Sequence, residues 1–280
     1  MTVRSRLLIV ALTIFAIAVG VLLGSGPLRS ALTGAGSSDE QALEEARAQA
    51  EAAQAQADLG YEFADAAGPA AVRGWLTDRE VAVVRLANVS EEDAAAASAK
   101  LTDAGATMVA NAALTDDWDS EDRAAFRDAL AAQITDSIED PPVGATSSDV
   151  LAAALAQALV PSDDFVTPGD EQRAQTLWAL LVDGGLVTGS RDTGADVVVL
   201  VAEDGDVAYL NRALAERSQG AVTAFTSGNA GDTGGVSSVT RAATPYGAWA
   251  VTAALIGSTN GLSGQYDASD APQLIGDLVQ

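Results

Sequence analysis

Hydrophobic and polar positions first mark out an apolar run near the N-terminus. Residues 7–23 contain no charge, and Thr13 carries their only hydroxyl group. As a helix, this run spans about 26 Å, the short end of the length that crosses the hydrocarbon core of a bilayer. Arg4 and Arg6 precede the run. The pattern predicts a single-pass membrane anchor, with the N-terminus in the cytoplasm and the bulk of the chain extracytoplasmic.

A cleaved signal peptide is the alternative interpretation of this run. Its charged start fits, but the run exceeds the ~7–15 apolar residues usual in a signal peptide. The best small-residue cleavage site is Thr33-Gly34-Ala35, which is a poor one. We prefer the uncleaved anchor, and both interpretations place the remainder outside the cytoplasm.

The next segment, residues 37–68, has a helical pattern. Ser37 and Glu40 have the spacing of a capping box, and strong helix formers follow to about Ala66. Apolar positions then recur at steps of three and four, as in a heptad seam. The seam residues expected to contact a partner are Leu43, Ala46, Ala50, Ala53 and Ala57. Because alanine buries little area, a lone helical stalk and a paired coiled coil explain the seam equally well. In a coiled coil, the partner helix would belong to a second copy of this chain or to another protein.

Beyond Gly68-Pro69, strand patterns alternate with helix patterns. The clearest strands are expected at 80–86, 107–114, 195–202 and 221–226. Helices are expected from Ser90 to Gly105 and at 121–134, 149–160, 171–182 and 207–217, with a linker at 136–148. Short strands near 237–241 and 248–253 precede a flexible glycine-serine tail. Strand and helix alternating at this spacing predict a parallel sheet built from βαβ crossovers.

The predicted fold class is α/β, with an N-terminal transmembrane helix and a coiled-coil stalk followed by Rossmann-like parallel-sheet units. Residues 1–36 hold the cytoplasmic tip, the anchor and a short link, and residues 37–68 form the stalk. Residues 69–140 form a first α/β unit. Residues 141–280 form a second α/β unit with the flexible tail.

Composition excludes several classes of function. The net charge of −24 and pI of about 4.1 leave no basic surface to bind nucleic acid. The sequence contains neither cysteine nor histidine, so it has no disulfide, no thiol nucleophile and no imidazole base. Serine–lysine catalysis would depend on Lys100, the only lysine, which is expected on a solvated helix face. We therefore expect no enzyme and assign no catalytic residue.

Two loops have compositions found in ligand-binding sites, but a structural role explains each of them more simply. The loop from Gly228 to Gly235 lacks the Gly-x-Gly-x-x-Gly spacing of a dinucleotide site and is predicted to be a connection. The acidic run from Asp116 to Asp122 lacks the central glycine of a calcium loop and is expected to crowd a helix N-terminus. No metal-binding or cofactor-binding residue is assigned.

The order of several motifs resembles the actinobacterial MctB family of copper transport envelope proteins. The motifs that carry the resemblance are Gly20–Gly26, Val81–Arg85, Ala104–Ala106, Leu114-Thr115, Asp183–Val187, Ala195–Ala202 and Gly264–Asp267. Asp267 departs from the glycine that closes the last motif in the family. The resemblance covers nearly the whole chain and implies a role in copper transport, efflux or homeostasis.

Copper enters only through this resemblance, because the residues themselves do not favour direct copper handling. Cu(I) prefers thiolate and thioether ligands and Cu(II) prefers imidazole, whereas this chain offers only Met1 and Met108. The alternative function is a non-enzymatic interaction or scaffold module. Such a module would use the coiled coil and the α/β head in cell-envelope assembly or division.

Overall fold

The computed structural model describes residues 46–55, 58, 60, 72–139, 141, 144–161 and 168–278. The chain divides into two compact units, Met1–Ala71 and Val72–Gln280. In the first unit, residues 46–55 are helical, as predicted, and exposed. The predicted anchor lies outside the described residues, and within those residues no helix combines the length and apolar character needed to span a membrane.

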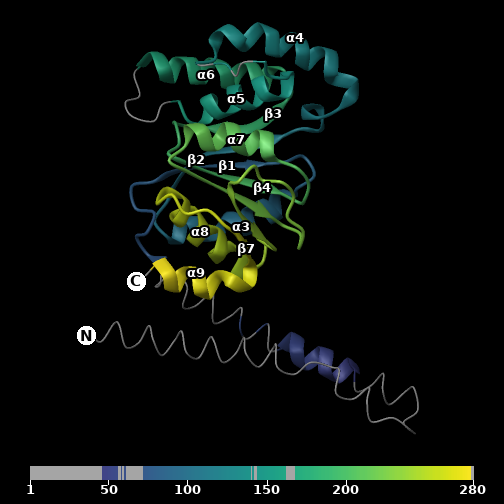
Figure 1. Ribbon diagram of the computed structural model, residues 1–280, viewed down its shortest axis with the longest axis vertical. Coiled ribbons are helices and arrows are strands. Elements are labelled where there is room, and N and C mark those ends of the chain that lie inside the picture. Colours follow the sequence, from purple (N-terminus) through teal and green to yellow (C-terminus); the bar gives the residue numbers. More distant parts are fainter. Residues whose placement is uncertain are drawn as a thin grey trace. The chain divides into compact units, whose positions relative to one another are not determined.

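The second unit is an α/β fold (Figure 1). Its strands are β1 Glu80–Arg85, β2 Thr107–Leu114, β3 Val187–Arg191, β4 Val197–Ala202, β5 Gly220–Phe225, β6 Ser237–Thr240 and β7 Gln265–Asp267. Its α-helices are α3 Glu91–Asp103, α4 Ala124–Ile134, α5 Ser147–Leu159, α6 Pro168–Asp183, α7 Ala208–Arg217, α8 Pro245–Thr259 and α9 Ala271–Leu278. Short 3-10 turns are η2 Asp116–Trp118, η3 Glu121–Arg123, η4 Thr135–Ser137 and η5 Ala268–Asp270.

In the part of the chain that the structure describes, the strands form one seven-stranded sheet of order β3-β2-β1-β4-β5-β6-β7. Every neighbouring pair is parallel except β2 and β3, which are antiparallel. The sheet is therefore mixed, which corrects the prediction of a purely parallel one. Its strands come from both predicted units, 69–140 and 141–280, and the two share this sheet.

Helices cover both faces of the sheet. Figure 1 shows α4, α5, α6 and α7 on one side and α3, α8 and α9 on the other. The central strands β4 and β5 are buried at every position, as expected for strands covered on both faces. This double cover explains why β4 is a continuous apolar run in the sequence.

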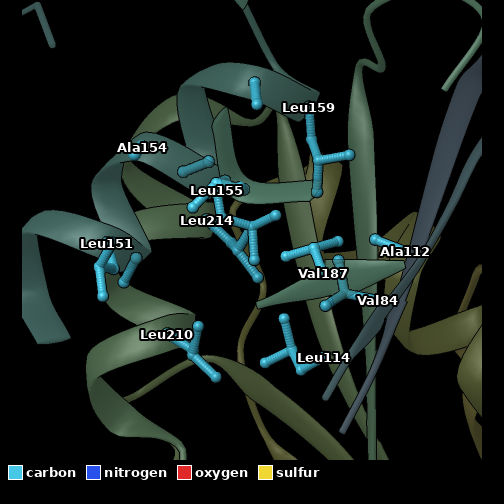
Figure 2. Packing of buried hydrophobic residues seen from close by; sticks show 14 of the residues in the cluster. Val84, Ala112, Leu114, Leu151, Ala154, Leu155, Leu159, Val187, Leu210 and Leu214 are labelled. Atoms are coloured by element: carbon cyan, nitrogen blue, oxygen red, sulfur yellow. The ribbon is translucent and has the colours of Figure 1, made fainter. Parts of the chain in front are cut away.

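Helix α5 is the centre of one helical layer. A capping box between Thr146 and Asp149 begins it, and its residues from Val150 to Leu159 are almost all buried. It packs against α4, α6 and α7. Figure 2 shows Leu151, Leu155 and Leu159 of α5 in the cluster that also holds leucines of α7 and side chains of the sheet. A helix that is apolar all round is stable only inside such a layer.

Two predictions for the C-terminal region were wrong. The segment expected to be a strand at 248–253 is the middle of helix α8, which begins with Thr244 as cap and Pro245 in its first turn. The segment expected to be a flexible tail contains β7, η5 and α9. Helix α8 is buried on all sides, and its apolar run therefore has no helical periodicity to distinguish it from a buried strand.

Candidate functional site

The strand order reverses between β1 and β4, and in doubly wound sheets ligands bind beside the carboxyl ends of the strands at such a point. Here the two following loops contact each other. The Leu86 N–H donates to the Val201 carbonyl at 2.9 Å, and the Asn88 side-chain amide donates to Glu203 Oε2 at 3.4 Å. The loop after β1 thus lies against the end of β4 and the loop that follows it.

The glycine-rich loop from Gly228 to Gly235 packs against the loop after β4. A Cβ on Gly231 would lie 1.6 Å from the Gly205 carbonyl oxygen, so the two backbones are in close contact. The Val207 N–H donates to the Asp232 carbonyl at 3.0 Å. The loop joins β5 to β6, which confirms the predicted connection, and its glycine at 231 serves backbone packing.

The acidic run after β2 is held by arginines. Arg127 Nη1 donates to the Asp117 carbonyl at 3.2 Å and also to the Ser120 carbonyl. Arg123 Nε lies 3.2 Å from Asp117 Oδ2. Guanidinium groups thus bind two main-chain carbonyls of the run and one carboxylate oxygen, that of Asp117. Across the described residues, no three acidic, histidine or cysteine side chains are grouped as a metal site would require.

A hollow of about 360 Å³ lies on the α3 side of the sheet. Strands β1, β2 and β3, with Asp192 directly after β3, form its floor, and one face of α3 forms its wall. The wall is low because α3 presents Ala95, Ser98 and Ala99 there. The floor is polar where β2 and β3 meet, since Asn111 and Ser190 pair across the two strands and both are exposed.

Opposite charges stand at the two ends of this hollow. Arg85 is half-buried at the end of β1, and its Nη1 donates to the Val89 carbonyl at 2.8 Å. Asp192 follows β3 at the other end, where its N–H donates to the Val109 carbonyl at 2.8 Å. In the structure as described, the side chains of Asn111, Ser190 and Asp192 form no hydrogen bond or ion pair within the protein. These polar groups are therefore available to a ligand.

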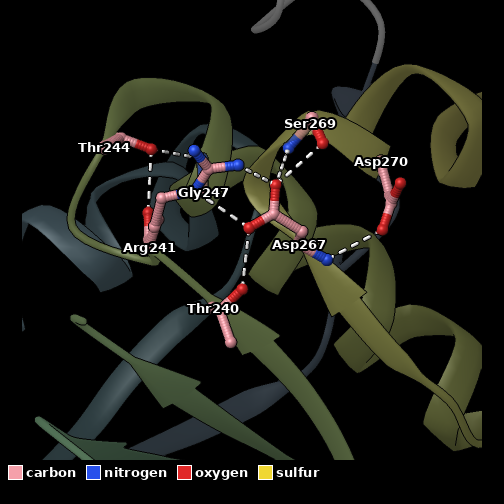
Figure 3. Close-up of polar contacts among 7 residues, drawn as sticks. All are labelled: Thr240, Arg241, Thr244, Gly247, Asp267, Ser269 and Asp270. Carbon is pink, nitrogen blue, oxygen red and sulfur yellow. Dashed lines mark hydrogen bonds and ion pairs between the residues drawn. The ribbon is translucent and has the colours of Figure 1, made fainter. Parts of the chain in front are cut away.

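A second polar cluster lies at the carboxyl ends of β6 and β7 (Figure 3). Asp267 accepts hydrogen bonds from Arg241 Nε at 2.9 Å, from Thr240 Oγ1 at 2.7 Å and from the Ser269 N–H at 3.0 Å. Arg241 Nη2 binds the second carboxylate oxygen. The cluster fastens β7 and η5 to the rest of the sheet, which gives a structural role to the residue that departs from the family motif.

The electrostatics of Asp267 follow from these contacts. Burial raises the pKa of its carboxyl group, but the hydrogen bonds from Arg241, Ser269 and Thr240 outweigh burial and hold the pKa well below its usual value. The hydrogen bonds to this carboxylate are donated by groups of the protein itself. The cluster thus holds the ends of β6 and β7 together and does not form a binding site of its own.

We expect Asp267→Asn to lower the free energy of unfolding by about 1–2 kcal/mol at pH 7, because it removes charge-assisted hydrogen bonds that are partly open to solvent. The ionised carboxylate stabilises the fold fully above its ordinary pKa of 3.8, and this stabilisation is lost as the pH falls below that value. Urea unfolding at pH 7 and at lower pH should therefore show the difference between variant and wild type narrowing in acid. A difference that is constant with pH would contradict this assignment.

The predicted seam lies partly within the structure. Ala46, Ala50 and Ala53 are on the helix at 46–55 and are exposed, whereas Leu43 and Ala57 lie outside the described residues. The expectation for Lys100 was wrong: its side chain is only 16% exposed, and its Nζ lies 5.3 Å from the centre of the Trp249 ring. Packing of α3 against α8 covers a position that the sequence placed in solvent.

The residues of the hollow were missed by the sequence analysis. Asn111 is the one signal that was present, because it is an amide inside the otherwise apolar run of β2. Arg85 and Asp192 are far apart in the sequence, and only the antiparallel pairing of β3 brings Asp192 to β2. No short-range motif connects them.

Comparison with known protein families matches residues 2–273 to the family described as copper transport outer membrane protein, MctB. The chain belongs to this family. The match confirms the resemblance of the MctB motifs over nearly the whole chain. A search among curated proteins finds no match.

The side chains of this MctB-family protein can be compared with the needs of copper as a cargo. Cu(I) sites use several thiolate or thioether ligands and Cu(II) sites use imidazole. The full sequence has two methionines and neither cysteine nor histidine. Met108, 38% exposed, lies on the floor of the hollow. One thioether beside the carboxylate of Asp192 is a poor ligand set for either oxidation state.

Proposed function

We propose that this chain is a membrane-anchored, extracytoplasmic protein that serves copper transport or homeostasis through contacts with other proteins, without catalysis and without carrying copper on its own side chains. Membership of the copper transport family supports the process. The absence of cysteine and histidine from the whole sequence is the observation that supports an indirect role.

The first experiment measures copper binding by the purified full chain in detergent, with Cu(I) delivered from a competing chelator. We expect binding no tighter than that of an acidic protein of similar charge, and no difference between wild type and Met108→Leu. Met108 is the position to substitute because it is the only methionine of the sequence outside the predicted cytoplasmic tip. Stoichiometric Cu(I) binding that Met108→Leu abolishes would overturn the indirect role.

The process itself is tested in cells. Deleting the gene should raise copper sensitivity, and both the wild-type chain and Met108→Leu should restore growth. A chain without residues 7–23 should fail to restore it, because the anchor is proposed to hold the head at the membrane. Unchanged copper sensitivity after deletion would remove copper from the proposal and leave the scaffold function.

The second candidate function is an interaction module for envelope assembly or division, and the exposed seam alanines favour it. We expect Ala50→Glu combined with Ala53→Glu to reduce self-association, because two carboxylates then enter the seam. Sedimentation of the full chain in detergent measures the mass. The matched control is Ala48→Glu with Ala52→Glu, which makes the same chemical change on the opposite side of the helix. Equal masses for wild type and both variants would reject the homo-oligomeric seam.

A further inference from the structure

The hollow between α3 and the β1–β2–β3 part of the sheet has the chemistry of a binding site. Its floor combines the apolar side chain of Val83 with the exposed amide of Asn111 and hydroxyl of Ser190. Its wall is made of alanine and serine side chains of α3. A volume of about 360 Å³ is at the lower end of small-molecule sites, and it suits a ligand of a few residues or rings.

The charges narrow the class of ligand. Arg85 is the single cation of the hollow, while Glu91 and Asp192 are acidic. A polyphosphate or nucleotide would meet two carboxylates against one guanidinium, which is unfavourable. A bare fatty acyl chain would leave the amide and hydroxyl of the floor unpaired. The two carboxylates stand at different ends of the hollow and do not form the converging oxygen set of a divalent cation site.

The separation of the charges sets the length of the ligand. Arg85 pairs with Ala113 of β2, and Asp192 lies beside Val109 of the same strand. Four residues of strand separate these positions, about 13 Å at roughly 3.3 Å per residue. An extended tripeptide is about 10 Å long, so it fits within this interval and its two charged ends come within reach of the two side chains.

We propose that this hollow binds a short peptide with free termini, whose carboxylate pairs with Arg85 and whose ammonium group pairs with Asp192. Asn111 and Ser190 lie between the two charges and hydrogen-bond to the peptide amides, since an amide side chain supplies both a donor and an acceptor. The alanine wall admits small side chains. Glu91, beside Arg85, disfavours ligands that carry a second negative charge. This binding site is independent of any role in copper transport.

The test is isothermal titration of the full chain in detergent with tri-L-alanine. We expect saturable binding with a dissociation constant of about 1 mM or lower. N-acetyl-tri-L-alanine lacks the ammonium group and tri-L-alanine amide lacks the carboxylate, and each should bind about tenfold more weakly. Absence of saturable binding by tri-L-alanine, or equal affinity for all three probes, would overturn the proposal.

Variants locate the site. Asp192→Asn should weaken tri-L-alanine about tenfold and leave N-acetyl-tri-L-alanine unchanged, because only the first ligand carries the ammonium group. Asp204→Asn is the matched control, since Asp204 is an exposed carboxylate in the loop after β4 and does not line the hollow. Ala99→Leu should block both peptides by filling the hollow from the wall. An Asp192→Asn variant that remains folded, as measured by its thermal unfolding, and binds tri-L-alanine as tightly as wild type would overturn the assignment.

Discussion

Gly247→Ala should lower the free energy of unfolding by about 3 kcal/mol, since a Cβ at this position has no space. It would lie 2.1 Å from the Arg241 carbonyl oxygen and 2.6 Å from the Ala242 Cα. Both are backbone atoms, so no side chain can rotate away. The Arg241 carbonyl is fixed further, because the Thr244 hydroxyl donates to it at 2.8 Å (Figure 3).

The matched control is Gly276→Ala in helix α9. A Cβ at Gly276 would meet no atom within 4 Å, and its backbone does not have the positive φ that favours glycine. Alanine is the better helix former, so this variant should be more stable than wild type by about 0.5–1 kcal/mol. Urea denaturation of the full chain measures both changes. If both variants lost stability to the same extent, the close contact beneath Gly247 would not be the cause.

Arg191→Met is the second substitution expected to have a large effect. Its side chain is 2% exposed, and its guanidinium forms a bidentate ion pair with Glu171, at 2.7 Å and 2.8 Å. Its Nε also donates to the Ala158 carbonyl at the end of α5. Removing it leaves the Glu171 carboxylate and the Ala158 carbonyl without these bonds, which should cost about 3–5 kcal/mol. Arg173→Met is the control, because its ion pairs are exposed and worth no more than about 1 kcal/mol.

The same pair predicts a dependence on pH. The hydrogen bonds from Arg191 lower the pKa of Glu171, with burial opposing them, below its ordinary value of 4.5. The ion pair therefore contributes its full stability above pH 4.5 and loses it as the pH falls further. The difference in unfolding free energy between wild type and Arg191→Met should narrow in acid. A difference that widens would show that the carboxylate is not the group stabilised by Arg191.

The sequence predicted the central strands and the crossover helices because their signals are local. Strand β1 and helix α3 were expected where they lie, and Ser90 caps α3 by accepting a hydrogen bond from the Asp93 N–H. Helix α6 ends at Asp183, just before the predicted stop at Gly184-Gly185. In these segments the apolar pattern and the capping residues indicate the same element with the same ends.

The sequence failed where burial removes periodicity or where pairing is long-range. The prediction of a strand at 248–253 was wrong because nearly all of helix α8 is buried, although Thr244 and Pro245 give a start signal for a helix. Strand β3 has three exposed residues, including Gly189 at φ +120, and shows no apolar pattern. The candidate site depends on this strand. It therefore could not be derived from the sequence alone.

The strand order has a consequence for how the chain is made. Strand β1 is hydrogen-bonded to β2 on one side and to β4 on the other, and β4 is synthesised long after β1. A nascent chain that ends at residue 140 contains β1 with one bare edge, because Val197–Ala202 does not yet exist. The middle of the sheet closes only when those residues emerge, and until then the unpaired edge of β1 is a target for aggregation.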